Sequence, residues 1–554
     1  MMSFFSKTAF STMRKNKMIY VPYLITASLM TMLYYILSSV QIMVAESGMS
    51  GSLTMTEILR VSRWVSGFLS LIFLFYINSF VMKRRSKEFG LFSVLGLEKG
   101  HLAKIVFWEI LFTFVSSLMI GIFSGAILSQ LMFLLLLYIV GIPSLLHFRF
   151  PFQAVGVTTI LFAAGWLVVL LYSQVVVFRS EPIAFLQSAK EGEREPKSKT
   201  WATLLGLLSL GAGYTLALKV VSPFEAIAIF FPAVMFVMLG TYCLFLSGSI
   251  ALLKLLRRNK NFYYHPSNFI SVSGMIYRMK RNAAGLASIC ILATAVLVTL
   301  SSTVCLYLGE EDMLDRQYPR DFTISSFWPA DSPDLFLLLK TVSSNYAKSY
   351  GLEIQNEYGS IEAIESDNDE PAQVYYTFYF DLNQEPSDYA FYENMRESYL
   401  QSIPRLAQTE SKSLVRAEFF QIYGSLLFVG VFFVALFLVT TVLIIYYKQI
   451  TEGFDDSERF RIMQQVGLSH KEVKQTILQQ ILMVFFLPLL VAFVHISVAF
   501  PVLLKMLTVF GMTNRNLFLL CVMSSCAVFA LFYGVIYRAT AGAYYRIVQN
   551  KQVS

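Results

Sequence analysis

Few residues in this sequence have the types and spacings that enzyme chemistry requires. The five histidines lie far apart along the chain, and neither H-E-x-x-H nor G-x-S-x-G occurs. No G-x-x-x-x-G-K-[ST] occurs either, so the chain has no loop of this kind to hold the phosphates of ATP. We therefore predict a chain that is not an enzyme, with no catalytic residue, no metal site and no cofactor of its own.

One ionisable side chain, Glu109, lies inside a long apolar run. A charge in hydrocarbon is costly, and such residues are often functional. Glu109 is only a turn or two from one end of its run. We therefore favour an interhelical hydrogen bond or snorkelling to the membrane surface over a role in proton coupling.

The composition indicates a membrane protein that spans the bilayer many times. The chain has 554 residues, of which 56% are hydrophobic and 14% are charged, whereas soluble domains carry about 25% charged residues. The mean hydropathy is +0.59. Nearly uncharged runs of the length that crosses hydrocarbon as a helix predict ten spans. They are residues 18–41, 61–82, 103–124, 152–178, 200–220, 226–253, 283–308, 418–447, 475–498 and 515–540.

The distribution of Lys and Arg predicts which loops are cytoplasmic. With ten spans and a cytoplasmic N-terminus, 30 of the 44 Lys and Arg residues fall on the inner side, as expected for short loops of such proteins. Both termini are then cytoplasmic, and residues 309–417 are outside. The apolar residues 125–141 are interpreted as a re-entrant or interfacial helix, or as an extension of the third span. The basic charge reflects sidedness, so we expect no nucleic acid partner.

An internal repeat divides the spans into two halves. The stretch "EFGLFSVLGL" at 88–97 aligns with "RFRIMQQVGL" at 459–468, and "MRKN" at 13–16 aligns with "MKRN" at 279–282. Both copies begin on the inner side, which predicts a parallel repeat. The first pair of stretches lies further apart along the chain than the second pair, which indicates an insertion outside the cell in the second half.

These features give the expected domain organisation. The fold class is a membrane all-α protein of about ten helices in two parallel repeats, with one small extracellular α/β domain. The expected parts are a first unit at 1–178, linker spans at 179–264, a basic elbow and span seven at 265–308, the extracellular domain at 309–417, and spans eight to ten at 418–554.

The two aligned stretches predict short cytoplasmic helices near 84–97 and 455–468, which we call the coupling helices. Each carries large apolar residues outside the membrane, and Gly96 and Gly467 are placed to end the helix. Such helices need a groove on a partner protein, although an amphipathic helix lying on the bilayer is the alternative. The candidate contacts are Glu88, Phe89, Leu91, Phe92, Gly96 and Leu97, with Arg459, Phe460, Ile462, Met463, Gly467 and Leu468.

The sequence pattern of residues 309–417 predicts a small mixed α/β domain. Strands are expected at 321–328 and 372–382 and a helix at 334–352. The segment has 20 acidic and 8 basic residues, a net charge of −12. An acidic, tyrosine-rich surface could contact a cationic peptide, but a solvated face and core tyrosines are the alternatives. The candidate ligand contacts are Asp367, Asp369, Glu370, Tyr375 and Tyr376.

The arrangement resembles the FtsX/MacB-type ABC transporter permeases, and within them the Bce-type permeases of bacitracin resistance. The resemblance covers nearly the whole chain and is strongest in "RRSKEFGLFSVLGL" at 84–97 and "SERFRIMQQVGL" at 457–468. Members have ten spans, two FtsX-like units, and one extracellular domain between spans seven and eight. The outer domain here is shorter than is usual for that family.

The resemblance implies a function and a set of partners. A homodimeric ABC ATPase, which holds ATP and Mg, would dock on the coupling helices in a bacterial cell membrane. Its motion would reach the outer domain without moving substrate across the bilayer. The implied role is resistance to antimicrobial peptides by freeing a lipid-linked cell-wall precursor, with signalling to a sensor histidine kinase. The alternatives are an FtsX-like lipoprotein-handling role, or a secondary transporter with parallel repeats.

Overall fold

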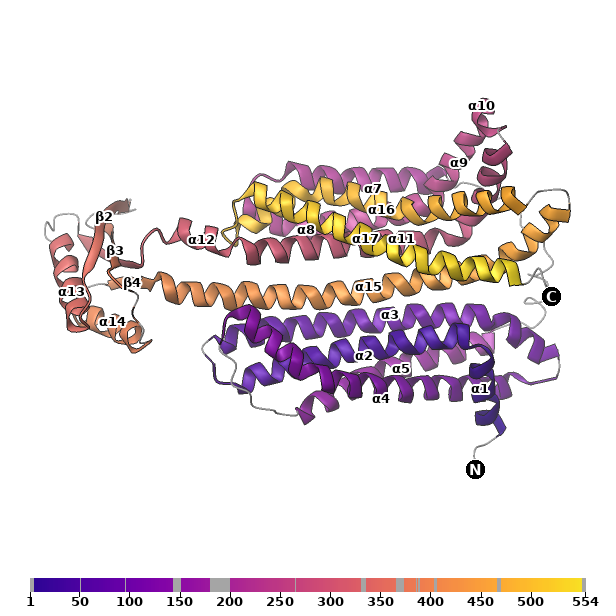
Figure 1. Ribbon diagram of the computed structural model, residues 1–554, viewed down its shortest axis with the longest axis horizontal. Helices are drawn as coiled ribbons and strands as arrows, with labels where there is room; N and C mark the ends of the chain where they lie inside the picture. Colours follow the sequence, from indigo (N-terminus) through magenta and orange to yellow (C-terminus); the bar gives the residue numbers. More distant parts are fainter. Residues whose placement is uncertain are drawn as a thin grey trace. The chain divides into compact units, whose positions relative to one another are not determined.

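Long helices make up most of the computed structural model (Figure 1). The structure describes residues 4–49, 51–94, 96–142, 151–179, 200–264, 266–329, 335–364, 373–384, 386, 389–402, 406–465 and 470–550. The chain forms two compact units. Unit 1 comprises Met1–Cys305, Ser425–Phe510 and Arg515–Ser554, and unit 2 comprises Leu306–Gly424 and Gly511–Asn514.

The first half of unit 1 is a group of five helices that pack on one another (Figure 1). They are α1 (Phe4–Lys15), α2 (Lys17–Glu46), α3 (Ser52–Val94), α4 (Lys99–Val140) and α5 (Phe152–Arg179). Aromatic and aliphatic side chains such as Tyr23, Phe162 and Trp166 fill the space between α2, α3, α4 and α5. The short helix α1 lies against α4, where Phe5 stacks on His101.

Helix α4 resolves the ambiguity over residues 125–141. It runs without a break from Lys99 to Val140, so these residues extend the third span. The helix ends at Gly141, whose φ of +75° is the left-handed conformation that glycine adopts at little cost. At about 1.5 Å per residue, a helix of 42 residues is longer than the ~30 Å of hydrocarbon that it crosses.

The linker spans form a tight helical hairpin. It contains α7 (Thr200–Lys219), α8 (Pro223–Cys243), the π-helical turn η1 (Leu244–Gly248), α9 (Ser249–Arg258) and α10 (Lys260–Tyr263). Ser222 and Glu225 form a capping box that begins α8. A Cβ atom on Gly240 would lie 2.7 Å from the backbone nitrogen of Leu210, so this approach of the two backbones requires glycine.

The second half of unit 1 contains four long helices. They are α11 (Pro266–Leu308), α15 (Lys412–Gln465), α16 (His470–Thr508) and α17 (Arg515–Asn550). Helices α11 and α15 begin or end in unit 2 and continue into unit 1. Helix α15 contacts the first half, because Tyr447 donates a hydrogen bond to the backbone carbonyl of Ile19 at 2.7 Å and stacks on Phe80.

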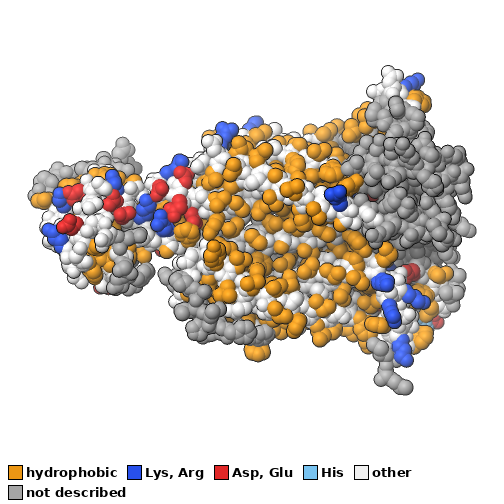
Figure 2. Space-filling view, in the orientation of Figure 1, with side chains coloured by type: hydrophobic (Ala, Val, Ile, Leu, Met, Phe, Trp, Pro, Cys, Tyr) orange, Lys and Arg blue, Asp and Glu red, His pale blue; other side chains and the backbone are white. Residues whose placement is uncertain are grey.

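The ten predicted spans are confirmed. Ten helices among the described residues are long and apolar enough to cross a membrane, and each overlaps one predicted span. The predicted limits were too short for several of them: the second runs over Ser52–Arg85 and the eighth over Lys412–Ile450. Hydrophobic side chains cover the face of these helices in Figure 2, and Lys and Arg gather near the end where α1 lies.

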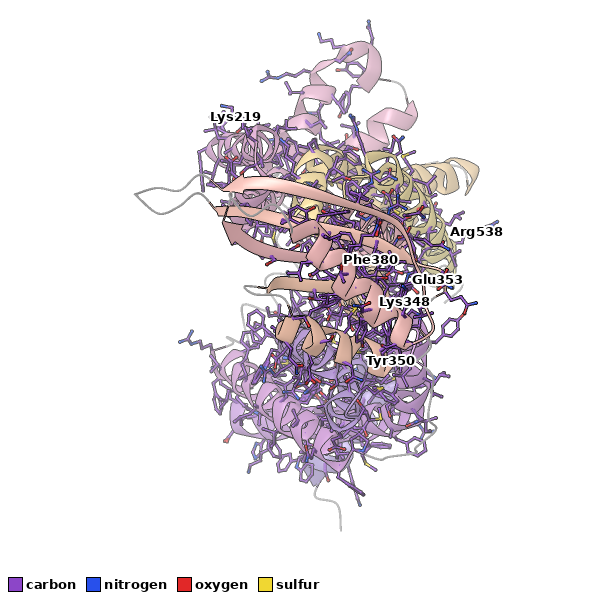
Figure 3. The ribbon with its side chains drawn as sticks, turned by 90° about the vertical axis from the view of Figure 1, so that its left-hand side faces the viewer. Lys219, Lys348, Tyr350, Glu353, Phe380 and Arg538 are labelled. Carbon is purple, nitrogen blue, oxygen red and sulfur yellow. The ribbon has the colours of Figure 1, made fainter. Side chains whose placement is uncertain are left out.

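Unit 2 is an α/β domain, as predicted. Its elements are α12 (Glu310–Gln317), β1 (Phe322–Pro329), α13 (Leu335–Ser349), β2 (Ile354–Ile364), β3 (Gln373–Leu382), α14 (Tyr389–Ser402) and β4 (Leu406–Ser411). The strands form an antiparallel sheet in the order β2-β3-β1-β4. Figure 3 shows Phe380 between the strands and the helices, where it belongs to the buried core of the domain.

Some elements of unit 2 were absent from the prediction. The predicted strands and helix correspond to β1, β3 and α13, but β2, α14 and β4 were missed. Strand β2 is the edge of the sheet and carries polar residues such as Asn356 and Glu357, which weakens the alternation that marks a half-buried strand.

Candidate coupling site at the end of helix α3

The first predicted coupling helix is the continuation of a membrane span. Helix α3 runs unbroken from Ser52 to Val94, although its membrane-spanning part ends near Arg85. The separate short helix predicted near 84–97 is therefore wrong for the first half. No loop therefore separates the predicted coupling helix from the span that precedes it.

The end of α3 lies where the sequence predicts it. Gly96 has a φ of +93°. Its N–H donates to the carbonyl of Ser93 at 3.1 Å, and the N–H of Leu97 donates to the carbonyl of Phe92 at 3.0 Å. These two bonds are those of a Schellman motif, which satisfies the last carbonyls of the helix and fixes the direction of the chain that follows.

A buried ion pair lies at the point where α3 leaves the membrane. Arg85 of α3 and Glu109 of α4 are 1% and 3% exposed, and their side chains form a direct salt bridge. Tyr20 of α2 joins them: its hydroxyl donates to Glu109 Oε2 at 3.0 Å and accepts from Arg85 Nη1 at 2.8 Å. Three helices thus meet at one charged cluster, and removing one partner would leave an uncompensated buried charge.

The cluster extends toward the membrane surface through Glu88. Arg85 Nε lies 3.3 Å from Glu88 Oε2, and the Asn16 side-chain amide donates to both oxygens of Glu88 at 3.0 and 3.2 Å. Asn16 is the residue between α1 and α2. The junction of α1 and α2, the end of α3 and the start of α4 are therefore held by one network of hydrogen bonds and charges.

The predicted contacts of the first coupling helix divide into two groups. Phe89 is 3% exposed and belongs to the core of the first half, where the Arg85 guanidinium lies 5.0 Å from its ring. Phe92 also packs against that core. Leu91 is 56% exposed, and Gly96 is exposed as well. Phe89 is thus buried within the chain and Leu91 is exposed, and the role of these residues as contacts of a partner stays a prediction.

The second coupling helix is described only in part. Helix α15 continues past its span to Gln465, which repeats the unbroken arrangement of α3. The side chains of Arg459, Phe460, Ile462 and Met463 lie outside the described residues, and so do Gly467 and Leu468 entirely. Their role as contacts stays a prediction.

The candidate ligand contacts of unit 2 do not form a described site. Tyr376 is buried in the domain core, so the core alternative holds for this residue. Asp367, Asp369 and Glu370 lie outside the described residues, as does the side chain of Tyr375. In the part of the chain that the structure describes, no three His, Cys, Asp or Glu residues are grouped so as to hold a metal ion.

Sequence reasoning found Glu109 but missed its partner and a second polar cluster. In the sequence, Arg85 looks like one more basic residue at the end of a span, beside Arg84. The signal that could have suggested the pair is a lone acid in one span together with a basic residue at the end of another. His495 of α16 is buried, with Nδ1 2.7 Å from the Tyr214 hydroxyl and Nε2 2.9 Å from the Thr241 hydroxyl. These contacts attach the α7–α8 hairpin to the second half.

Comparison with known proteins identifies the class of this fold. Residues 63–181 match the family described as FtsX-like permease C-terminal. The chain is 24% identical over 532 residues to the ABC transporter permease protein YxdM of Bacillus subtilis, an alignment that covers 79% of this chain and 83% of the relative. It is 28% identical over 270 residues to the uncharacterized ABC transporter permease YvcS of the same organism, covering 49% and 41%.

A third relative carries a more specific name. The bacitracin export permease protein BceB of Bacillus subtilis is 27% identical over 262 residues, which cover 46% of this chain and 40% of the relative. The chain thus spans about two fifths of the length of YvcS and BceB and about four fifths of YxdM. Residues 63–181 therefore form an FtsX-like permease domain, and the chain is a homologue of Bacillus ABC transporter permeases that include a bacitracin export permease.

Proposed function

We propose that this chain is the permease subunit of an ABC transporter that receives motion from a separate ATPase homodimer at the ends of α3 and α15. ATP and Mg are held by that ATPase. The observation that carries the proposal is the exposed Leu91 on a helix that is continuous with a span and anchored by Arg85 and Glu109. A force on Leu91 is passed to the span, because no loop lies between them.

Helix α15 supports the second part of the proposal, which is transmission to the extracellular domain. It begins at Lys412, directly after β4, and continues to Gln465. The backbone N–H of Lys412 donates to the carbonyl of Asp321, the residue before β1, at 2.8 Å. One helix of 54 residues therefore follows β4 directly and also contains residues 455–465 of the predicted second coupling helix.

We further propose that the transmitted motion serves resistance to antimicrobial peptides. The support is the name of the relative BceB and the net charge of −12 in residues 309–417, which suits a cationic peptide. On this proposal the extracellular domain frees a lipid-linked cell-wall precursor from the peptide, and a membrane sensor histidine kinase is a second partner. A secondary transporter is less well supported, because Oε2 of Glu109, the one acid inside an apolar run that the sequence singled out, is held in an ion pair with Arg85 and a hydrogen bond from Tyr20.

Co-purification tests the docking step. We expect the tagged wild-type chain, extracted from the native membrane, to carry an ABC ATPase with a P-loop that mass spectrometry identifies. Leu91→Asp should reduce the recovered ATPase at least about tenfold, because it places a charge in the centre of an apolar contact. The matched control is Leu337→Asp in α13, since Leu337 is 61% exposed and Leu91 is 56% exposed. Normal ATPase recovery with Leu91→Asp, or none with the wild type, would contradict the proposal.

A further inference from the structure

The two halves place aligned residues in equivalent contacts at their centres. In the register that pairs Gly96 with Gly467, Phe114 of α4 aligns with Phe485 of α16, and Trp166 of α5 aligns with Tyr537 of α17. The rings of Phe114 and Trp166 lie 5.9 Å apart, and those of Phe485 and Tyr537 lie 5.0 Å apart. Because the same contact occurs in both halves, the two interiors can be compared position by position.

The first half has a buried amide whose hydrogen bonds are all made within the protein. Asn78 of α3 lies among apolar neighbours that include Ile77 and Val81. Its side-chain nitrogen donates to the Ser173 hydroxyl at 2.8 Å, and its side-chain oxygen accepts from the Tyr23 hydroxyl at 3.4 Å. Both ends of this amide therefore have partners, and it needs no water.

In the second half, the position aligned with Asn78 borders a small cavity. Gln449 of α15 aligns with Asn78 and is 6% exposed, yet neither its nitrogen nor its oxygen has a hydrogen-bond partner among the described residues. In the register that pairs "MRKN" with "MKRN", Ile289 stands at the position of Tyr23, so the hydroxyl that would reach the amide is lost. Gln449 lines a cavity together with Ile289, Phe485 and Tyr533.

Charged side chains line this cavity where the first half has aliphatic ones. Lys448 aligns with Ile77, Glu452 aligns with Val81, and both line the cavity. The volume that water molecules can occupy is about 20 Å³. A single water needs roughly 10–15 Å³ of such space and two to four polar partners, and an apolar cavity of this size would stay empty. Space and polar groups are both present here.

We propose that the cavity between α11, α15, α16 and α17 is a binding site for ordered water, which supplies the missing partners of the Gln449 amide. An amide buried without partners is costly, and a bridging water removes most of that cost. The second half then holds water beside Lys448 and Glu452, at the position where the first half has the Asn78 amide bonded to Ser173 and Tyr23. If the proposed function holds, α15 can shift against its neighbours by rearranging water, while α3 moves with its bundle.

Radiolytic hydroxyl-radical labelling of the wild-type chain in lipid nanodiscs tests this directly, because it modifies aromatic side chains that lie beside bound water. We expect oxidation of Phe485 and Tyr533 to exceed that of Phe114 and Trp166 in the first half at least about fivefold, although tryptophan is the more reactive ring. The experiment needs no ATPase, so its outcome is independent of the docking test. Equal or greater labelling of Phe114 and Trp166 would overturn the proposal.

A matched pair of variants separates bound water from general solvent access. Gln449→Leu removes the amide that holds the water, and we expect labelling of Phe485 and Tyr533 to fall to the level of the first half. Asn78→Leu, at the aligned position, should leave labelling of all four rings unchanged. Gln449→Leu should not lower the melting temperature, since it breaks no hydrogen bond among the described residues. Undiminished labelling in a folded Gln449→Leu protein would show that Gln449 holds no water.

Discussion

The two halves of unit 1 are both built from long apolar helices but place their buried charged groups differently. In the first half, Arg85 and Glu109 form a buried pair, and the Asn78 amide further along α3 bonds to Ser173 and Tyr23. In the register of the coupling helices the aligned positions hold Asp456 and Gln480, so that pair is lost. The second half instead places Lys448, Gln449 and Glu452 around a small cavity.

This difference indicates how a duplicated fold can specialise. Helix length and the direction of each span are set by apolar runs, which both halves retain. Which helices are fixed to one another is set by a few buried polar groups, and these can change without altering the architecture. A paired charge fixes three helices at one point, whereas the hydration that we propose for Gln449 would let its helix adjust. In the first half, buried ion pairing fixes the helices to one another, and in the second half the proposed water would allow α15 to move.

The largest expected effect comes from removing the Arg85–Glu109 ion pair. Arg85→Leu should lower the free energy of unfolding by about 3–5 kcal/mol, because it leaves the Glu109 carboxylate buried without its cation. The double variant Arg85→Leu/Glu109→Leu should recover most of that loss, since a buried pair can be replaced by apolar residues at little cost. Thermal unfolding of the purified chain in detergent, analysed as a double-mutant cycle, measures the coupling.

The outcome decides whether the Arg85–Glu109 pair holds α3 against α4. If Arg85→Leu is no more harmful than the double variant, the pair does not hold α3 against α4, and the contrast between the halves fails.

The second prediction concerns His495, which attaches the linker hairpin to the second half. His495→Phe should cost about 1–3 kcal/mol, because the Tyr214 and Thr241 hydroxyls each lose a partner in the membrane interior. The aligned residue of the first half is Ser124, whose hydroxyl donates, among the described residues, to the backbone carbonyls of Ile120 and Gly121 in its own helix. Ser124→Ala should therefore leave the melting temperature unchanged. Equal losses in the two variants would contradict this asymmetry.

The sequence was sufficient for the spans because each is a long apolar run, and hydropathy reports such runs directly. It was insufficient for residues 125–141, since hydropathy alone does not distinguish a helix that extends beyond the membrane from one that turns back. Gly96 was predictable as the end of α3 because glycine is favoured at that position for a local steric reason.

The candidate site depended on contacts that local patterns do not contain. Arg85 and Glu109 are 24 residues apart, on two helices whose rotation about their axes is set by packing. Phe89 and Leu91 look alike in sequence, yet α2 and α4 cover one and leave the other exposed. Strand β2 was missed because an edge strand needs little apolar alternation. What hydropathy could not supply in each case was the neighbouring element.

The smallest expected effect concerns Glu310, which aligns with buried Val44 in the register that pairs "MRKN" with "MKRN". Burial raises the pKa of Glu310 to about 8, and the adjacent Glu311 adds to the shift while Arg416 opposes it. The folded protein therefore prefers the neutral carboxyl. Its contribution to stability is complete below pH 4.5, the ordinary pKa of glutamate, and is lost as the pH rises toward 8.

Solvent screening reduces the effect, so we expect the melting temperature at pH 8.5 to reflect a loss of about 1 kcal/mol relative to pH 5 from this residue. Glu310→Gln should remove that part of the pH dependence, because the amide does not titrate. Glu311→Gln is the comparison variant: Glu311 is exposed and its charge only adds to the shift that burial causes, so the variant should reduce the pH dependence without removing it. The contrary result would be a wild-type melting temperature that rises between pH 5 and pH 8.5 and a Glu310→Gln variant with the same pH dependence. It would show that this carboxyl is ionised in the folded state. The presence of Glu310 at the position that corresponds to Val44 would then add no pH dependence to the stability.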